Sequence, residues 1–245
     1  MSKETSRWRS ERLENKEVLL ARWGDVGKPV LLFPTAAGDA EEIERFHMIR
    51  VLAGLLEQQK IKVYSVDSLA GQEWIAGEKG AGHAAWFQNG FASFIENEVV
   101  PAVRADCRSN DIEIIAAGSS IGAYNALLSI CRRPDIFSHA ICMSGTYDLW
   151  KKFGEGPKTP DYQRISPLDF IPQLGDAHLE KLRSRFVLIT HGKGKWEAPE
   201  ESWWVANALG AKGIPNRVDE WGEEWNHDWP TWRNMLPKYL EELVG

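Results

Sequence analysis

The stretch IIAAGSSIGAYNAL, residues 114–127, sets two serines between glycines at the joint of two apolar runs. The first run is typical of a buried strand, and the second has the helical spacing of a buried helix. Polar residues at such a joint predict a sharp strand-to-helix turn that lifts one serine out of the core. The pentapeptide GSSIG fits G-x-S-x-G with Ser120 at its centre, which makes Ser120 the candidate nucleophile. The alternative is a tight turn whose serine only caps the helix.

The two glycines of the pentapeptide have a steric reason. A nucleophile on such a turn has strained backbone geometry, and the residues two before and two after it pass close to each other. Gly118 and Gly122 occupy these two positions. We therefore expect both to be sites where a side chain would clash.

Strand-like and helical segments alternate on both sides of this stretch. The strand-like runs are residues 17–23, 28–34, 61–67, 111–118, 139–145, 185–192 and 216–222, and the helical ones are 39–59, 83–107, 121–133, 199–213 and 229–243. Short strands that are apolar on both faces predict a mostly parallel central sheet with helices on both faces. The first two runs, joined by GDVG, are expected to form an antiparallel hairpin. We expect one domain over residues 1–245, with an irregular surface insertion at about 146–176.

A serine hydroxyl needs a base, and in this kind of fold the partners follow in the order Ser, acid, His. His227 lies between the last strand-like run and the last helix, in EEWNHDWPTW, and is the candidate base. It could instead be a capping or packing histidine. The acid should follow the run 185–192, where Glu197 is the first carboxylate. Asp219 and Glu200 remain alternatives, although Glu200 begins a helix, where a carboxylate is favoured without any catalytic role.

An ester hydrolase also needs donors for the oxyanion. The residue after the nucleophile, Ile121, supplies one backbone N–H, and a loop after an early strand supplies the second. The small residues of PTAAG make Thr35 or Ala36 the candidate in that loop. Three aromatic residues of the insertion are expected to line the acyl or alcohol pocket: Trp150, Phe153 and Tyr162.

Taken together, these stretches resemble the α/β-hydrolase superfamily. The resemblance is closest to the "putative esterase" group of esterase D-like, feruloyl-esterase-like and antigen-85-like proteins. It rests on VLLFPTAAGDAEE, VYSVDS, ENEVVP, GSSIGAYNAL, RRPDIF, MSGTYDL and NHDWPTW. It implies hydrolysis of a small or medium carboxylic ester through an acyl-enzyme, without metal or organic cofactor. The sequence departs from many relatives at the acid, because Lys195 stands where they carry an Asp and Glu197 comes two residues later.

Composition narrows the other possibilities. The net charge is −6 with no basic block, which disfavours nucleic-acid binding. No apolar run reaches the ~20 residues of a membrane span, and the polar N-terminal stretch does not show the apolar h-region expected of a signal peptide. Three cysteines without C-x-x-C spacing predict reduced thiols in a cytoplasmic protein. A small-molecule ester is the expected partner; an acyltransferase, or a non-catalytic binding protein of the same fold, is the alternative.

Overall fold

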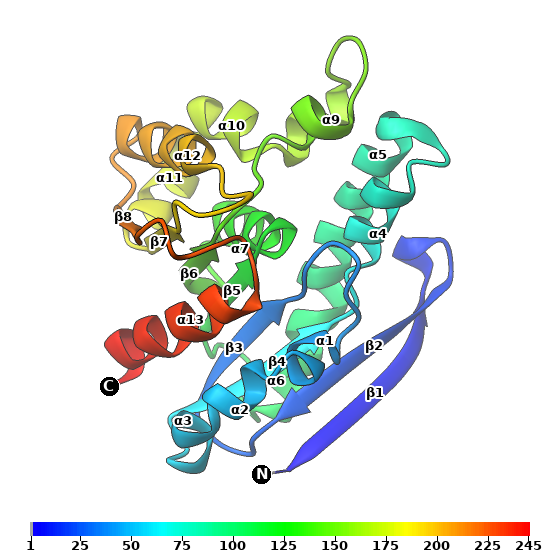
Figure 1. The fold of residues 1–245 in the computed structure, drawn as a ribbon. Coiled ribbons are helices and arrows are strands. Elements are labelled where there is room, and N and C mark those ends of the chain that lie inside the picture. The colour runs from blue at the N-terminus through cyan, green and yellow to red at the C-terminus, as the bar shows by residue number, and fades with distance from the viewer. Residues whose placement is uncertain (1) are drawn as a thin grey trace.

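A twisted sheet runs through the computed structural model, which describes residues 2–245 (Figure 1). Within these residues the strands are β1 (Lys3–Ser10), β2 (Lys16–Trp23), β3 (Lys28–Phe33), β4 (Ile61–Val66), β5 (Ile114–Ser119), β6 (Phe137–Met143), β7 (Phe186–His191) and β8 (Asn216–Glu220). Their order in the sheet is β1-β2-β4-β3-β5-β6-β7-β8. The six strands from β3 to β8 are parallel, so the predicted mostly parallel sheet is confirmed.

The hairpin expected between β2 and β3 is wrong. β2 pairs antiparallel with β1 on one side and with β4 on the other, and β3 lies between β4 and β5. The sequence gives no sign of β1 because it is a mostly exposed edge strand without apolar alternation. β3 is buried from its second residue onward, which suits an interior position in a parallel sheet.

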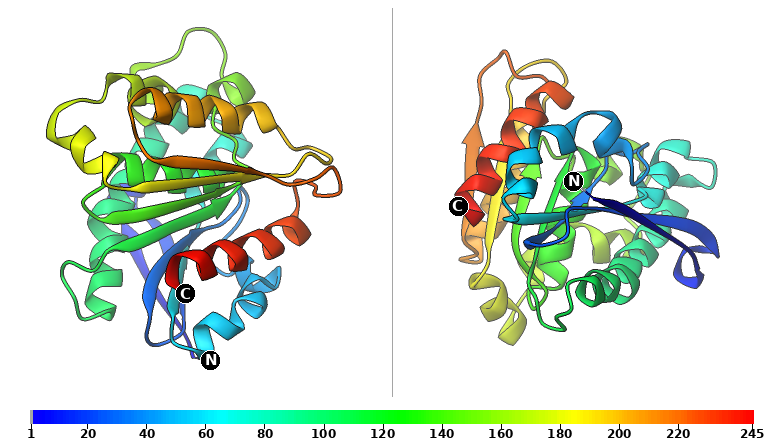
Figure 2. Two further views of the ribbon diagram at one scale, coloured as in Figure 1. Left: turned by 90° about the vertical axis from the view of Figure 1, so that its left-hand side faces the viewer. Right: turned by 90° about the horizontal axis from the view of Figure 1, so that it is seen from below.

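Helices cover both faces of the sheet, as predicted (Figure 2). One face carries α4 (Leu69–Ala76), α5 (Gly80–Phe94), α6 (Val100–Asp106), α7 (Ile121–Arg132), α11 (Asp176–Arg183) and α12 (Pro199–Ala211). The other face carries α1 (Glu42–Arg45), α2 (Met48–Val51), α3 (Ala53–Glu57) and α13 (Trp229–Val244). Each face has its own cluster of buried apolar side chains, and the sheet separates the two.

Two predicted helical segments differ from expectation in detail. Residues 39–59 form the three short helices α1 to α3 instead of one, with His47 in a left-handed conformation between the first two. Residues 83–107 form the expected long helical segment, but a π-helical turn, Ile95–Val99, joins α5 to α6. The helix α4 was not predicted.

The insertion at 146–176 is more regular and more buried than expected. It contains α8 (Leu149–Phe153), α9 (Pro160–Ile165), α10 (Pro167–Phe170) and the 3-10 turn Ile171–Gln173. The side chains of Tyr147, Tyr162 and Ile165 are fully buried in the core cluster of this face. The insertion is therefore part of the packed body of the molecule.

Candidate active site

Ser120 lies on a strained turn between β5 and α7. Its φ of 58° and ψ of −123° are unfavourable for a residue with a side chain. Ser120 is partly exposed, whereas Ser119 is only 4% exposed as the last residue of the strand. The Ser120 side chain makes no capping hydrogen bond to α7, so the helix-cap alternative does not describe this turn.

The glycines on either side of Ser120 are required by close packing. A Cβ on Gly118 would lie 2.3 Å from the carbonyl carbon of Gly122, and one on Gly122 would lie 2.5 Å from the Phe33 carbonyl oxygen. Real Cβ atoms do not approach other atoms so closely. A side chain at either position would force the backbone of the turn to shift, so this geometry requires glycine at both, as the sequence predicts.

Two loops at the same sheet edge bring Glu197 and His227 together. The amide of Gly194 donates to the Trp225 carbonyl (2.9 Å), and that of His227 donates to the Lys195 carbonyl (3.0 Å). Glu197 Oε2 lies 3.8 Å from His227 Nδ1, a close ion-pair contact but longer than a hydrogen bond. The Glu197 side chain is only 1% exposed and that of His227 is 22% exposed. A buried carboxylate thus faces the ring nitrogen of a histidine that solvent can reach.

Ser144, which the sequence analysis missed, holds the other oxygen of this carboxylate. Its hydroxyl donates to Glu197 Oε1 (2.6 Å) and accepts from the Trp232 indole N–H (3.0 Å). Trp232 also packs edge-on against the ring of His227, with centroids 5.2 Å apart. Ser144 belongs to MSGTYDL and directly follows β6. Its position at the carboxyl end of a parallel strand, where site residues gather, could have identified it from the sequence.

The other carboxylates considered for the acid are either exposed or bonded to groups other than His227. Asp219 lies in β8, with contacts to Lys238 (3.7 Å) and Arg217 (3.4 Å). Glu200 is exposed in the first turn of α12. Its neighbour Glu201 accepts hydrogen bonds from the amides of residues 147 and 148 at the start of the insertion. Neither alternative acid forms an ion pair with His227 within residues 2–245.

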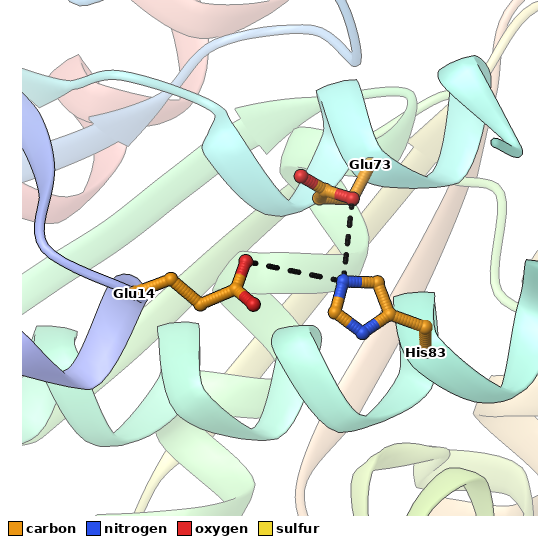
Figure 3. Close-up of side chains that lie close together, drawn as sticks. All are labelled: Glu14, Glu73 and His83. Carbon is orange, nitrogen blue, oxygen red and sulfur yellow. Dashed lines mark ion pairs between the residues drawn. The ribbon is translucent and has the colours of Figure 1, made fainter. Parts of the chain in front are cut away.

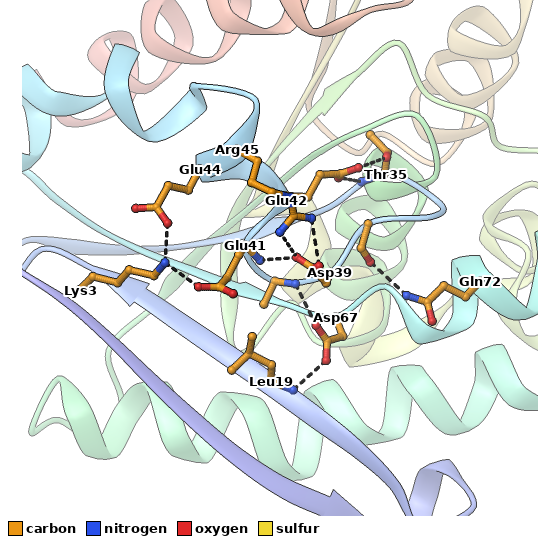
Figure 4. A network of polar contacts seen from close by, with 12 residues as sticks. Lys3, Leu19, Thr35, Asp39, Glu41, Glu42, Glu44, Arg45, Asp67 and Gln72 are labelled. Atoms are coloured by element: carbon orange, nitrogen blue, oxygen red, sulfur yellow. Dashed lines mark hydrogen bonds and ion pairs between the residues drawn. The ribbon is translucent and has the colours of Figure 1, made fainter.

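In the loop after β3, residues 34–40, one of the two expected oxyanion donors, the Thr35 amide, is not available. The Thr35 amide donates to Glu42 Oε2 (2.8 Å) and the Thr35 hydroxyl donates to Glu42 Oε1 (2.7 Å), as Figure 4 shows. The Thr35 N–H is therefore already taken. The Ala36 N–H has no acceptor among the hydrogen bonds of residues 2–245. Burial raises the pKa of Glu42, and the hydrogen bonds from Thr35 oppose that shift.

A cavity of about 480 Å³ lies between α4, α5 and the insertion. Its aromatic lining is Trp74, Trp150 and Phe153, and glycines of the α4–α5 turn border it. Tyr162, the third aromatic residue expected there, is fully buried and does not line it. The Tyr162 hydroxyl instead accepts from the Trp150 amide (3.1 Å) and donates to Asp148 (3.2 Å), so it supports the insertion from within.

One group of potential metal ligands occurs within the described residues. Ligand atoms of Glu14, Glu73 and His83 lie within 4.8 Å of one another where the β1–β2 connection meets α4 and α5 (Figure 3). Lys16 contacts the Glu73 carboxylate at 2.5 Å and Lys79 contacts Glu14 at 3.3 Å. Since these cations already balance both carboxylates, the group is an ion-pair cluster that links the β1–β2 connection to α4 and α5. It contains none of the candidate catalytic residues.

Within the described residues, no cysteine takes part in a disulfide, and no helix is suited to cross a membrane. The three cysteines are free, and burial raises the pKa of Cys142 to about 12, so this group is a neutral thiol near pH 7. Among residues 2–245, no helix has the length and apolar character needed to cross a membrane.

The strand order and the helices on both faces define the class of protein: the chain has the α/β-hydrolase fold. Residues 57–243 match the family model described as "Putative esterase", and the chain belongs to this family. It is a carboxylic ester hydrolase. The resemblance found in the sequence is thereby confirmed. Among curated proteins, none matches the sequence.

Solved structures agree on the fold. A ferulic acid esterase superimposes with a TM-score of 0.74 at 16% identity, covering 99% of this chain and 98% of its own. An S-formylglutathione hydrolase from Agrobacterium tumefaciens gives 0.71 at 14% identity, covering 99% and 95%. The fluorophosphonate-binding serine hydrolase F of Staphylococcus aureus gives 0.74 at 15% identity, covering 100% and 98%. At such identities the likeness shows the fold alone.

Proposed function

We propose that the protein hydrolyses carboxylic esters through an acyl-enzyme on Ser120. The observation that carries this proposal is the strained, partly exposed elbow at Ser120, on the same sheet edge as the pair of Glu197 and His227. Glu197 fixes the ring of His227 through Nδ1 and stabilises the imidazolium that forms during reaction. The other ring nitrogen of His227 then takes the Ser120 proton.

The reaction has two balanced steps. Ser120 Oγ attacks the acyl carbon, the carbonyl electrons move to oxygen, and the alcohol leaves with the proton that His227 returns. Water then attacks the acyl-enzyme, with His227 taking its proton and giving it back to Ser120, and the free acid leaves. The 3.8 Å between Glu197 and His227 suits this scheme, since catalytic hydrogen bonds are often long before substrate binds.

Two backbone amides are proposed to bind the oxyanion. Ile121 is the first residue of α7, where N–H groups have no acceptor inside the helix. Ala36 supplies the second N–H, because that of Thr35 is engaged by Glu42. The two loops are in contact, since Gly122 packs against the backbone oxygens of Phe33 and Pro34.

The acyl group is proposed to enter the cavity lined by Trp74, Trp150 and Phe153. The insertion that carries two of these residues begins at the nucleophile, where the Thr146 amide donates to the Ser120 carbonyl (3.3 Å). Three aromatic side chains in the wall and a volume of about 480 Å³ suit a small or medium acyl group. Nitrophenyl esters of rising acyl length test this assignment. Trp150→Ala should shift the preferred length, whereas Trp203→Ala, an exposed residue of α12 outside the cavity, should not.

A fluorophosphonate probe tests the nucleophile. Such probes react with activated serines, so the folded wild-type protein should be labelled at Ser120 and the Ser120→Ala variant should not. Ser119→Ala is the matched control and should be labelled like the wild type. Folded wild-type protein that stays unlabelled, with no turnover of any ester, would favour the non-catalytic alternative. Ester turnover that accelerates with an added alcohol while less acid is formed would favour the acyltransferase alternative.

A further inference from the structure

The side chain of Glu42 is the most unusual charged group near the proposed site. Glu42 lies in the first turn of α1 and is only 6% exposed. Its two oxygens accept the amide and the hydroxyl of one residue, Thr35, seven positions earlier (Figure 4). Within residues 2–245 it forms no ion pair, since the nearby Arg45 contacts Asp39 instead.

Burying a carboxylate without a cation costs free energy that two neutral donors offset only in part. A fold that needed only stability would be served better there by an apolar side chain. The neighbouring Glu41 contrasts with this arrangement, because it forms an ordinary surface ion pair with Lys3. The burial of Glu42 therefore has to be explained by what its carboxylate holds.

The rest of the loop, residues 34–40, is fixed equally firmly. Gly38 packs on Glu42 so closely that a Cβ there would lie 2.3 Å from Oε2. The amide of Ser68 and the side-chain amide of Gln72 both donate to the Gly38 carbonyl, at 3.1 and 3.3 Å. A Cβ on Gly71 would lie 2.6 Å from the Ala36 carbonyl oxygen. Ala36 is thus clamped between α4 and the base of the loop.

We propose that Glu42 is a positioning residue for the oxyanion hole. By taking both donors of Thr35, it fixes the loop so that the Ala36 N–H stays free to bind the oxyanion together with that of Ile121. This inference rests on the proposed ester hydrolysis at Ser120. Glu42 touches no reacting atom, so its whole effect passes through the position of the loop.

Two substitutions of Glu42 test the proposal. Glu42→Leu keeps the approximate volume but removes both acceptors, and we expect kcat to fall about 10- to 100-fold while KM stays within about threefold. This is less than the 10²–10³ lost with an oxyanion donor itself, because the donor is only displaced. Glu42→Gln can still accept the Thr35 amide and should retain more of kcat than the Leu variant. Glu41→Gln is the matched control and should keep wild-type kcat.

A second measurement separates positioning from general damage to the fold. A trifluoromethyl ketone forms a tetrahedral oxyanion with the active serine, so its affinity should fall in Glu42→Leu by about the same factor as kcat. The affinity for the carboxylic acid product, which forms no tetrahedral adduct, should change little. Equal loss of both affinities would mean that Glu42 supports the fold of the whole site, and would overturn the proposal.

The activity of the Glu42 and Thr35 variants separates failure of this proposal from failure of the proposed function. A folded Glu42→Leu variant with kcat within twofold of the wild type overturns the proposal, while ester hydrolysis at Ser120 still stands. If that variant does not fold, Thr35→Val decides, because it removes only the hydroxyl that Glu42 holds. A several-fold loss of kcat at constant KM then supports the proposal, and an unchanged kcat rejects it. Wild-type protein without ester hydrolysis or labelling at Ser120 rejects the proposed function itself.

Discussion

The turn that carries Ser120 and the residues that surround it are held in place in different ways. Backbone sterics hold the turn: a Cβ on Gly118 would clash with Gly122 of the same turn, and a Cβ on Gly122 would clash with Phe33 of the adjacent strand. The strained backbone is at Ser120. Side-chain hydrogen bonds between distant segments hold the surroundings, as Ser144 holds Glu197 from 53 positions away. Steric constraints on a turn can be recognised from the glycines in its sequence. A hydrogen bond between segments that are far apart in the chain cannot be recognised in this way.

The largest expected effect separates the two serines of the turn. Ser120→Ala should lower kcat by about 10⁶-fold while the fold persists, by comparison with loss of the nucleophile in subtilisin. Ser119→Ala should have little effect, because that side chain is buried at the end of β5. Steady-state hydrolysis of a nitrophenyl ester checks both variants. Substantial activity in Ser120→Ala would mean that the turn serves another purpose.

The next effect concerns the acid. Glu197→Gln keeps the size of the side chain but cannot hold the same tautomer of His227, so kcat should fall about 10⁴-fold, as for the equivalent change in a serine protease. Glu200→Gln, an exposed neighbour three residues on, should stay within about twofold. The same ester assay checks this pair. Comparable losses in both variants would show that the acid lies elsewhere.

A third pair of variants compares the free energy of unfolding after substitution of a tightly packed glycine and of an unpacked one. Gly122→Ala places a Cβ 2.5 Å from the Phe33 carbonyl oxygen, and overpacking of this kind should lower the free energy of unfolding by about 1–3 kcal/mol. Gly210→Ala, inside α12 with nothing within 4 Å, should raise it by about 0.4–1 kcal/mol. Urea denaturation followed by circular dichroism measures both. A destabilised Gly210→Ala or an unaffected Gly122→Ala would contradict the steric account.

The smallest expected effect is that of metal removal. The proposed steps use a serine, a histidine, a carboxylate and backbone amides, and Lys16 and Lys79 already balance the cluster at Glu14 and Glu73. Dialysis against a strong chelator should therefore leave kcat unchanged. A loss of activity that added zinc or calcium restores would require a different mechanism.

The same contrast explains what the sequence could predict. The parallel strands, the helices on both faces and the joint at Ser120 follow from apolar periodicity and from glycine, which act locally. The edge strand β1 carries no such pattern because almost nothing in it is buried. The position of β3 between β4 and β5 depends on long-range pairing, so the expected hairpin with β2 was wrong.

Within the candidate site, the sequence singled out residues whose position in the chain order predicts a role. The sequence did not reveal which backbone N–H groups are free to bind an oxyanion. Only the structure shows that the Thr35 amide donates to Glu42. Nor did the sequence separate Tyr162, which is buried, from Trp150 and Phe153, which line the cavity. Such distinctions depend on the packing of segments that are far apart in sequence.

Trapping the acyl-enzyme tests directly whether Ser120 is the nucleophile. Wild-type protein is mixed with a nitrophenyl ester, quenched in acid during turnover and digested, and the mass of the peptide that contains residues 114–127 is measured. We expect a mass increase equal to the acyl group on Ser120, and we expect it to decay as the ester is consumed. Steady turnover with this peptide unmodified, or with the acyl group on another residue, would contradict this expectation.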